Sequence, residues 1–435
     1  MVSHRPNRRN FLKRALSTTA IATVPVHGWF PGRMALGASG SSSPNERIQV
    51  AHIGLGGRGS YLLGRMMKLK ELDVVGVSDV DLKHLQGGYE KVWRRAQASA
   101  DYRRLLDNRD VEAVVIASPD HWHCKMAVEA CQAGKDVYVE KPTSTFVEEG
   151  RRMVEAARAH ERVVQVGIHH RSNDVMREIV EMIRSGRIGK VHTVKTWMWE
   201  HPFKELSAPG EPPLWLDYDQ WLGPAPRVPY HPDGVHFNFR WRRDYAGGYM
   251  TDWGVHMLNV VTHAMDVDRK GPKSVEAWGR YAPRNLYDFP MSMEARWEFN
   301  DPDFTLTWTQ PSSDAPLADR KYGMNFHGEA GELRTYFHGY EFFVDGKSAE
   351  LPAPRPGGVD IGRSPGHIEN WVECMRSRKS PVADIEVGHR TTSLCLLGNV
   401  ALDAGRKLVW DWESERFPDD QDANGLLSRH GSGRA

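Results

Sequence analysis

Short apolar runs alternate with segments of helical period over the first 190 residues. Apolar runs typical of buried strands lie at 48–53, 72–77, 111–116, 136–139 and 163–167. Segments with the period of an amphipathic helix lie at 60–69, 82–98, 123–133, 146–160 and 175–185. Because strands that alternate with helices form parallel sheets, the pattern predicts a doubly wound domain over 46–168, in which six strands are expected and these runs locate five.

The pattern changes to β-rich segments after residue 190. These segments suit a large, mostly antiparallel, open-faced sheet and lie at 192–200, 274–281, 293–299, 304–310, 322–327 and 333–337. A Pro- and Trp-rich stretch over 202–244 has no clear period, and loops of that length are usually functional or disordered. The predicted fold class is α/β followed by α+β, with a second domain over 169–412.

The end of the chain carries one more helix and a polar tail. The apolar helical pattern at 390–407 could pack back on the first domain, and a short strand at 408–412 follows it. The tail over 413–435 is polar, and we expect it to be loosely held beyond Phe417.

The first 43 residues differ from the rest because they carry six basic residues and no acidic one. The run Arg8-Arg9-Asn10-Phe11-Leu12-Lys13 and the apolar stretch 15–26 resemble a twin-arginine export signal, with a Gly- and Ser-rich linker over 37–43. A disordered basic tail is the alternative, and the stretch is too short for a membrane span of about 20 residues. We therefore expect a periplasmic or otherwise exported protein whose partner is the export machinery.

Charge, cysteines and histidine spacing argue against other classes of function. Without the six basic residues of the first 43, 51 basic groups face 56 acidic ones, so no nucleic-acid partner is expected. The four cysteines have no close paired spacing and are expected to be free thiols. No catalytic metal is expected, because zinc-binding spacing is missing among His121, His123, His169, His170 and His256.

Glycines follow the first predicted strand where a helix begins. The turn comprises Gly54, Leu55, Gly56, Gly57, Arg58 and Gly59. Such glycines let the backbone approach a pyrophosphate, which the free N–H groups of the helix N-terminus bind. Asp79, twenty residues after Gly59, is placed to bond the ribose hydroxyls and repel a 2′-phosphate. The turn therefore predicts NAD as cofactor, with NADP less favoured; a strand-to-helix turn without ligand is the alternative.

Further polar residues follow the next strands and should meet at the same edge of the sheet, where ligands bind. The residues expected to contact the cofactor there are Ser118, Pro119, Asp120, His123, Glu140, Lys141 and Gln165. The triplet Glu140-Lys141-Pro142 and the glycine-rich motif 247–256 resemble the Gfo/Idh/MocA family of sugar and cyclitol oxidoreductases. The resemblance covers roughly residues 46–412.

This resemblance implies catalytic roles for Lys141, Asp252 and His256. The family's lysine sits beside the nicotinamide and the reacting hydroxyl, and Lys141 holds that position. Asp252 and His256 are four residues apart, which on a helix places both on one face. His256 is the expected general base and Asp252 a substrate ligand; a helix cap and a core histidine are the alternatives. Asn259 departs from the family pattern, which often has an acidic residue there.

Residues expected to bind a sugar lie in a loop after the fifth strand, in the Trp-rich stretch and in the 247–256 motif. They are His170, Arg171, Asn238, Arg240, Trp241, Asp252 and His256. His170 and Arg171 are equally compatible with plain surface positions. Tryptophan faces suit pyranose rings, and Trp241 is favoured because Arg240 and Asn238 lie close to it in sequence.

The resemblance implies hydride transfer between a ring hydroxyl carbon of a sugar, glycoside or cyclitol and NAD. Export in the folded state predicts that the cofactor is bound before transport and is tightly held. Two alternatives stay open: a redox-assisted glycosidase or lyase of the same family, and a non-catalytic dinucleotide-binding protein. The broad antiparallel sheet suggests a homo-oligomer, a dimer or a tetramer, as in the family.

Overall fold

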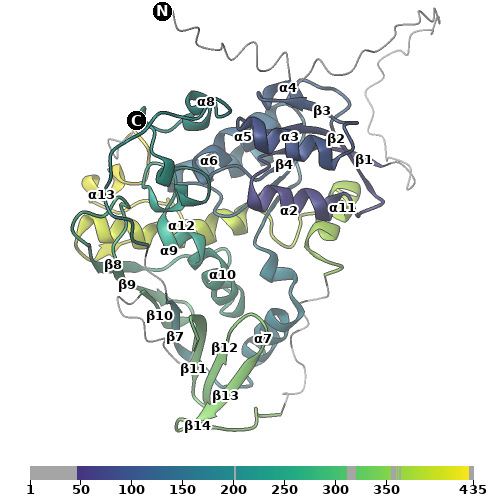
Figure 1. The fold of residues 1–435 in the computed structure, drawn as a ribbon. Coiled ribbons are helices and arrows are strands. Elements are labelled where there is room, and N and C mark those ends of the chain that lie inside the picture. The colour runs from purple at the N-terminus through teal and green to yellow at the C-terminus, as the bar shows by residue number, and fades with distance from the viewer. Residues whose placement is uncertain are drawn as a thin grey trace, which may run out of the picture.

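Two β-sheets, with helices packed between and around them, make up the protein (Figure 1). The computed structural model describes residues 47–199, 202–310, 320–353, 359, 361 and 364–430. The predicted export signal and linker over 1–43 lie outside these residues. No helix in the described part of the chain is long and apolar enough to cross a lipid bilayer.

The first sheet is parallel and has the strand order β3-β2-β1-β4-β5-β6. Its strands are β1 (Ile48–Ile53), β2 (Leu72–Ser78), β3 (Gln97–Ser99), β4 (Ala113–Ile116), β5 (Asp136–Val139) and β6 (Val164–Val166). The central strands are buried along almost their whole length, because helices cover both faces of the sheet. The order in which successive strands are added reverses between β1 and β4, and this switch point is where such sheets bind ligands.

Helices connect these strands and continue into the second domain. They are α2 (Gly57–Met66), α3 (Leu82–Lys91), α4 (Arg103–Leu106), α5 (Asp120–Gln132), α6 (Val147–Ala159), η1 (His169–Ser172) and α7 (Asp174–Arg184). The helix predicted over 82–98 ends early, at Lys91, and Trp93 and Arg94 then take left-handed backbone angles. Residues 97–99 form the sixth strand instead. This strand escapes the apolar pattern because it is three residues long and largely exposed.

The second sheet has nine strands in the order β14-β13-β12-β11-β7-β10-β9-β8-β15. They are β7 (Val191–Met198), β8 (Ser274–Arg280), β9 (Ser292–Asn300), β10 (Asp303–Gln310), β11 (Tyr322–Gly328), β12 (Gly331–Thr335), β13 (Tyr340–Val344), β14 (Lys347–Ser348) and β15 (Leu408–Val409). All neighbours are antiparallel except β7 and β10. The predicted fold class is therefore confirmed, and β13 and the edge strand β14 beside it were not predicted.

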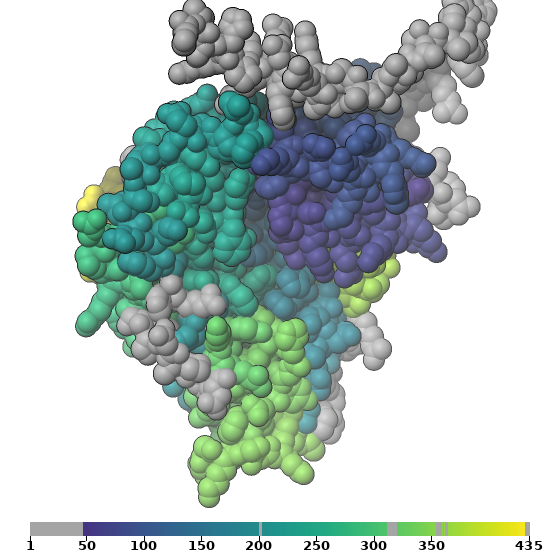
Figure 2. Space-filling view, in the orientation of Figure 1, coloured from purple at the N-terminus to yellow at the C-terminus, as the bar shows by residue number. Residues whose placement is uncertain are grey.

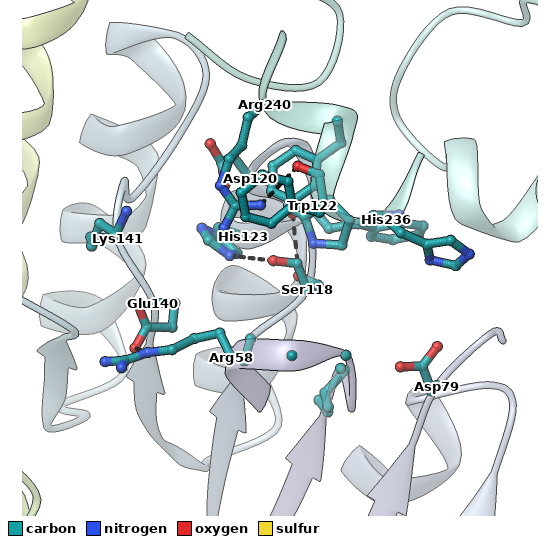
Figure 3. A pocket seen from close by; sticks show the side chains of 18 of the residues that line it. Arg58, Asp79, Ser118, Asp120, Trp122, His123, Glu140, Lys141, His236 and Arg240 are labelled. Carbon is teal, nitrogen blue, oxygen red and sulfur yellow. Dashed lines mark hydrogen bonds and ion pairs between the residues drawn. The ribbon is translucent and has the colours of Figure 1, made fainter. Parts of the chain in front are cut away.

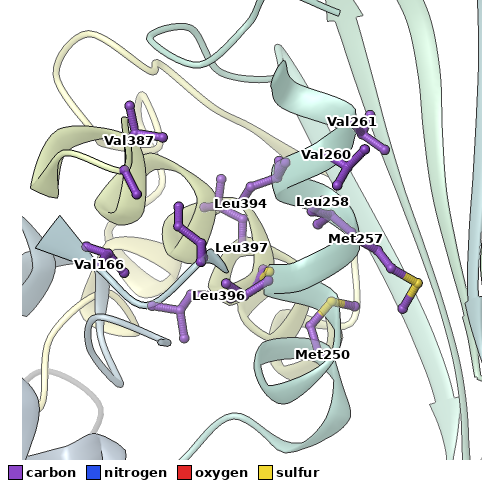
Figure 4. Close-up of a cluster of buried hydrophobic side chains, with 14 of the residues drawn as sticks. Val166, Met250, Met257, Leu258, Val260, Val261, Val387, Leu394, Leu396 and Leu397 are labelled. Atoms are coloured by element: carbon purple, nitrogen blue, oxygen red, sulfur yellow. The ribbon is translucent and has the colours of Figure 1, made fainter. Parts of the chain in front are cut away.

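Helices of the second half of the chain join the two sheets. They are α8 (Tyr218–Leu222), η2 (Pro232–Gly234), η3 (His236–Trp241), α9 (Gly248–Asp252), α10 (Gly254–Ala264), α11 (His367–Ser377), α12 (Ile385–Ala404) and α13 (Gln421–Gly425). Leucines of α12 pack between Val166 of β6 and the apolar face of α10 (Figure 4). On α11, Trp371 is fully buried against Tyr138 of β5. Segments after residue 364 therefore complete the core of the first domain.

The tail is held more firmly than its polar sequence suggests. Phe417, Ala423 and Leu427 are buried at 1% exposure or less. Arg429 bonds Glu149 of α6, so the tail crosses the first domain. The prediction of a loose tail beyond Phe417 is wrong, because three widely spaced apolar residues anchor it without forming any visible period.

The Pro- and Trp-rich stretch over 202–244 folds into short helices with a small core of its own. Backbone hydrogen bonds attach it to the first domain: Leu82 donates to Trp215 at 2.8 Å, and Asp217 donates to Val80 at 3.1 Å. The stretch is therefore fixed beside the carboxyl end of β2.

Candidate active site

A cavity of about 930 Å³ lies at the carboxyl edge of the first sheet, between the two domains. Figure 2 shows the seam where the purple and blue first domain meets the teal residues of the second. The cavity is lined from the first domain by the glycine turn and the ends of β2, β4 and β5, and from the second by η3, α9, α10, β11 and the residues after β12.

The glycine turn after β1 is closed so tightly that side chains would not fit. Gly54 has a φ of 86°, and a Cβ there would lie 2.6 Å from the Ala117 backbone. A Cβ on Gly59 would lie 1.9 Å from the Gly54 carbonyl oxygen. No side chain caps the N-terminus of α2, so its first N–H groups are available to an anion. Gly56 and Gly57 line the cavity, and the turn therefore fits a pyrophosphate.

Asp79 is held in place by the backbone around it. Its carboxylate accepts the N–H of Leu55 at 2.7 Å and the N–H of Asp81 at 2.8 Å. The Leu55 side chain is buried in the core, so this residue positions Asp79 through its backbone and does not line the cavity. A carboxylate fixed beside the glycine turn fits the ribose of a dinucleotide.

The residues after β4 and β5 meet in the cavity as expected (Figure 3). Arg58 pairs with Glu140 at 2.8 Å, and the His123 ring lies between the carbonyl oxygens of Ser118 and Pro142. Asp120 is buried, and burial raises the pKa of its carboxyl to about 8, although Arg240 and Lys141 favour the charged form. Asp120 is therefore a carboxylic acid that keeps its proton at neutral pH.

Lys141 and Asp252 form a partly buried ion pair in the same cavity. The Lys141 Nζ donates to the carbonyl oxygen and to the Oδ1 of Asp252, both at 2.7 Å. Arg240 donates to the same Oδ1 at 3.2 Å. Burial alone would raise the pKa of Asp252, but Lys141 and Arg240 hold it below its usual value. The carboxylate therefore stays charged and fixes the lysine ammonium group.

Three imidazole rings gather beside this pair. His256 lies with its ring centroid 5.2 Å from that of His169 and 5.0 Å from that of His170. The Nδ1 atoms of all three are buried without a hydrogen-bond partner among the described residues. Burial and then the charge of Lys141 hold the pKa of His256 well below its usual value. His256 is therefore held in its neutral form.

Besides Leu55 and Gly59 of the glycine turn, four further residues predicted from the sequence do not line the cavity. Gln165 is fully buried and donates to the His367 carbonyl oxygen. Arg171 is buried in an ion pair with Asp268 and bonds Asn259. Trp241 packs in the core against Tyr249, and Asn238 stays outside the cavity wall. The structure does not place these four in the cavity wall: Gln165, Arg171 and Trp241 are engaged in buried contacts elsewhere, and Asn238 is outside the lining.

An aromatic wall that the sequence analysis missed takes the place of Trp241. The ring centroids of Trp253 and Tyr322 lie 4.8 Å apart. Phe337 stacks on His170, with ring centroids 3.9 Å apart. All four line the cavity. Trp253 could have been found from its position inside the 247–256 motif, whereas Tyr322 and Phe337 have no local signal. Asn259 donates to Thr391 and supports Arg171, so its role is structural.

Comparison with known families agrees with this architecture. The profile described as "Oxidoreductase family, NAD-binding Rossmann fold" of Gfo/Idh/MocA matches residues 48–168, and the profile of its C-terminal alpha/beta domain matches residues 176–286. The chain belongs to this oxidoreductase family. Its first domain is thus an NAD-binding Rossmann domain.

Curated relatives of this Gfo/Idh/MocA chain include a named dehydrogenase and a named glycosyl hydrolase. Inositol 2-dehydrogenase of Salmonella typhimurium is 31% identical over 145 residues, which are 33% of this chain and 43% of that protein. A glycosyl hydrolase family 109 protein of Shewanella pealeana is 28% identical over 203 residues, which are 42% of this chain and 44% of that protein. The region that matches this chain therefore covers less than half the length of each of these relatives.

Solved structures share the fold at low sequence identity. The WlbA dehydrogenase from Bordetella pertussis, in complex with NADH and UDP-GlcNAcA, has a TM-score of 0.65 at 18% identity over 84% of this chain and 99% of that one. An aldose-aldose oxidoreductase from Caulobacter crescentus, complexed with glycerol, has a TM-score of 0.61 at 19% identity over 84% and 100%. Both likenesses extend to nearly the whole described part of the chain.

Proposed function

We propose that this chain interconverts a hydroxyl and a carbonyl on a ring carbon of a sugar, glycoside or cyclitol, with a tightly held NAD as its redox partner. The observation that carries the proposal is the meeting of the Lys141–Asp252 pair and a neutral His256 in the cavity of an NAD-binding domain. The named relatives and structural neighbours include dehydrogenases of this kind.

Different residues of the protein would bind the cofactor, orient the reacting oxygen and accept the proton. When bound, NAD would accept or return a hydride at its nicotinamide ring. The turn at Gly56 and Gly57 and the Asp79 carboxylate would hold the dinucleotide. The Lys141 ammonium group orients the reacting oxygen and stabilises the negative charge that develops there. His256 takes the hydroxyl proton, because its neutral imidazole faces the same space.

A purified sample decides whether the cofactor is retained. Denaturing the protein and analysing the supernatant by mass spectrometry should yield about one dinucleotide per chain, as NAD or NADH. Sugars and cyclitols are then screened for a change in the redox state of that cofactor. A preparation without stoichiometric dinucleotide would contradict the tightly held cofactor, and no redox change with any sugar would contradict the oxidoreductase.

Export is part of the proposal. The twin-arginine-like run Arg8-Arg9 supports transport of the folded, cofactor-loaded protein to the periplasm. Changing both arginines to lysine should leave the protein in the cytoplasm, which cell fractionation measures. The same distribution of the unchanged protein and the double variant between cytoplasm and periplasm would argue against this route.

We also propose self-association through the open face of the second sheet. Trp278 of β8 pairs with Glu294 of β9 on that face, and 52% of Trp278 is exposed. The number of subunits, two or four, is measured by light scattering.

A redox-assisted glycosidase is the second candidate, and Asp120 favours it. This buried carboxylic acid lines the same cavity and could protonate a leaving aglycone. The likeness to a glycosyl hydrolase family 109 protein points the same way. Incubation with nitrophenyl glycosides separates the two activities. Release of nitrophenol without a net change in NADH would favour the glycosidase, whereas net NADH formation would favour the dehydrogenase.

A non-catalytic dinucleotide-binding protein is the third candidate. It predicts that the Lys141→Met and His256→Ala variants bind NAD and turn over as little substrate as the unchanged protein does. Any turnover that depends on these side chains excludes it.

A further inference from the structure

A second group of metal-ligating side chains lies at the outer end of the cavity, away from Lys141. Figure 3 shows His236 and Asp79 on the opposite side of the view from Lys141. The ligand atoms of Asp81, His84 and His236 all lie within 4.8 Å of one another. Asp81 caps the N-terminus of α3 and His84 lies in the first turn of that helix, whereas His236 begins η3 in the second domain. The group therefore bridges the two domains.

We propose that Asp81, His84 and His236 bind a divalent transition-metal ion of the zinc class, which joins the two domains at the outer end of the cavity. Imidazole nitrogens together with one carboxylate oxygen are a ligand set that zinc-class ions prefer. Three protein ligands leave one of the four positions for water. Metal binding itself does not depend on the proposed reaction, whereas its effect on cofactor release rests on the proposed function.

The spacing of the side chains suits such an ion better than a direct hydrogen bond. The Nε2 of His236 lies 3.5 Å from the Oδ2 of Asp81, and the rings of His84 and His236 lie edge to face with centroids 5.1 Å apart. Ligands about 2.1 Å from a tetrahedral metal are separated from one another by about 3.4 Å. Side-chain movements of about an ångström would therefore bring all three ligands into place.

Asp81 provides a second, independent observation. The residue is 3% exposed, and its Oδ1 already accepts the N–H groups of Lys83 and His84 at the start of α3. No described residue donates a hydrogen bond to its Oδ2, which is directed at His236. Asp81 lines the cavity, so this oxygen is open to a cation there, and a carboxylate oxygen is a ligand that zinc-class ions accept.

The backbone around the site is already fixed across the domain boundary. The hydrogen bonds of Leu82 with Trp215 and of Asp217 with Val80 tie the start of α3, where Asp81 and His84 lie, to the 202–244 stretch. The Lys83 ammonium group lies 3.4 Å from the centre of the Trp215 ring. Because Asp79 lies beside His84, a metal here would close the ribose end of the cavity and slow release of the dinucleotide.

Direct metal binding tests the site. The full chain, carrying an affinity tag without histidines and treated with chelator, is titrated with Co²⁺ by visible absorption and with Zn²⁺ by calorimetry. We expect about one ion per chain, and at least about 100-fold weaker binding in His236→Ala, His84→Ala and Asp81→Asn. The exposed His160→Ala should bind as the unchanged protein does. Absence of stoichiometric binding, or unchanged affinity in His236→Ala, would overturn the proposal.

Cofactor release tests the consequence. The NAD-loaded protein is passed through a desalting column with and without Zn²⁺, and retained dinucleotide is measured over time. Slower loss with Zn²⁺ in the unchanged protein, and no effect of Zn²⁺ in His236→Ala, would support the bridge between domains. Equal rates in the presence of bound metal would overturn that role, whatever activity the enzyme shows.

Discussion

At the reacting end of the cavity, the position of Lys141 depends on its ion pair with Asp252. Lys141 is only partly buried, but two oxygens of Asp252 hold its ammonium group at 2.7 Å. Arg240 shares the same carboxylate, so the charge of Asp252 remains compensated if the lysine is lost. A variant without the lysine should therefore fold and lose only its chemistry.

Replacing Lys141 with Met tests this role. We expect kcat to fall by about 10²–10³-fold, the usual cost of removing a group that stabilises developing negative charge, with the dinucleotide still bound. Steady-state rates and cofactor content are measured on the same sample. Lys125→Met, on the exposed side of α5, is the control and should keep its rate. A rate within about twofold of the unchanged enzyme would contradict the assignment of Lys141.

Asp120 makes stability depend on pH. Burial raises the pKa of this carboxyl from 3.8 to about 8, so between these values the folded state holds a proton that the unfolded chain has lost. The free energy of unfolding therefore decreases as pH rises through this window. Asp120→Asn carries no charge at any pH and should lose this dependence.

Thermal unfolding of the cofactor-free protein measures the effect. The melting temperature of Asp120→Asn minus that of the unchanged protein should increase as pH rises from about 5 to about 8. The exposed Asp110→Asn serves as control and should follow the unchanged protein. A constant difference between Asp120→Asn and the unchanged protein would show that Asp120 ionises normally.

At the level of elements, the turn from β1 to α2 is set by backbone contact. A Cβ on Gly59 would approach the Gly54 oxygen to 1.9 Å, whereas a Cβ on Gly57 would meet nothing within 4 Å. Gly59→Ala must open the turn, so we expect a loss of several kcal/mol and loss of bound dinucleotide. Gly57→Ala, in the first turn of α2, should be neutral or stabilising by about 0.5 kcal/mol. Denaturant unfolding compares them, and equal stabilities would contradict the close contact.

The helices and strands differ in how visible they are in the sequence. Long buried strands such as β1 and strongly amphipathic helices such as α7 repeat apolar residues at their own period, so they were predicted. The short strand β3 and the edge strand β14 have few buried side chains, so no period marks them. These strands depend on hydrogen bonds to a neighbouring strand that the local sequence does not show.

For the whole molecule, the tail closes the structure. Glu415 bonds Arg151 of α6 at 2.8 Å and His389 of α12 at 2.7 Å, and Phe417 is buried behind it. A chain ended at residue 412 would leave His389 buried without its partner. We expect a loss of at least about 3 kcal/mol in unfolding free energy, measured by denaturant titration. A chain ended at residue 430 is the control, and equal stability of the two would contradict a structural role for the tail.

The open face of the second sheet gives a prediction about assembly. Trp278→Glu should shift the protein from an oligomer towards a monomer, because it places a charge on the proposed contact face. Light scattering after gel filtration measures the mass. Trp93→Glu, at a residue with 73% exposure in the first domain, is the control. A monomeric unchanged protein, or an oligomer that Trp278→Glu leaves intact, would contradict the contact.

The sequence by itself determined the strand–turn–helix that holds the dinucleotide, because these features depend on neighbours in the chain. Gly54, Gly59 and Asp79 were identified in this way, as was Lys141 at the end of β5. Only the tertiary structure decided which side chains face the cavity. It turned Arg171 and Trp241 into the core and brought Tyr322 and His236 to the wall, since contacts between distant segments have no period or spacing in the sequence.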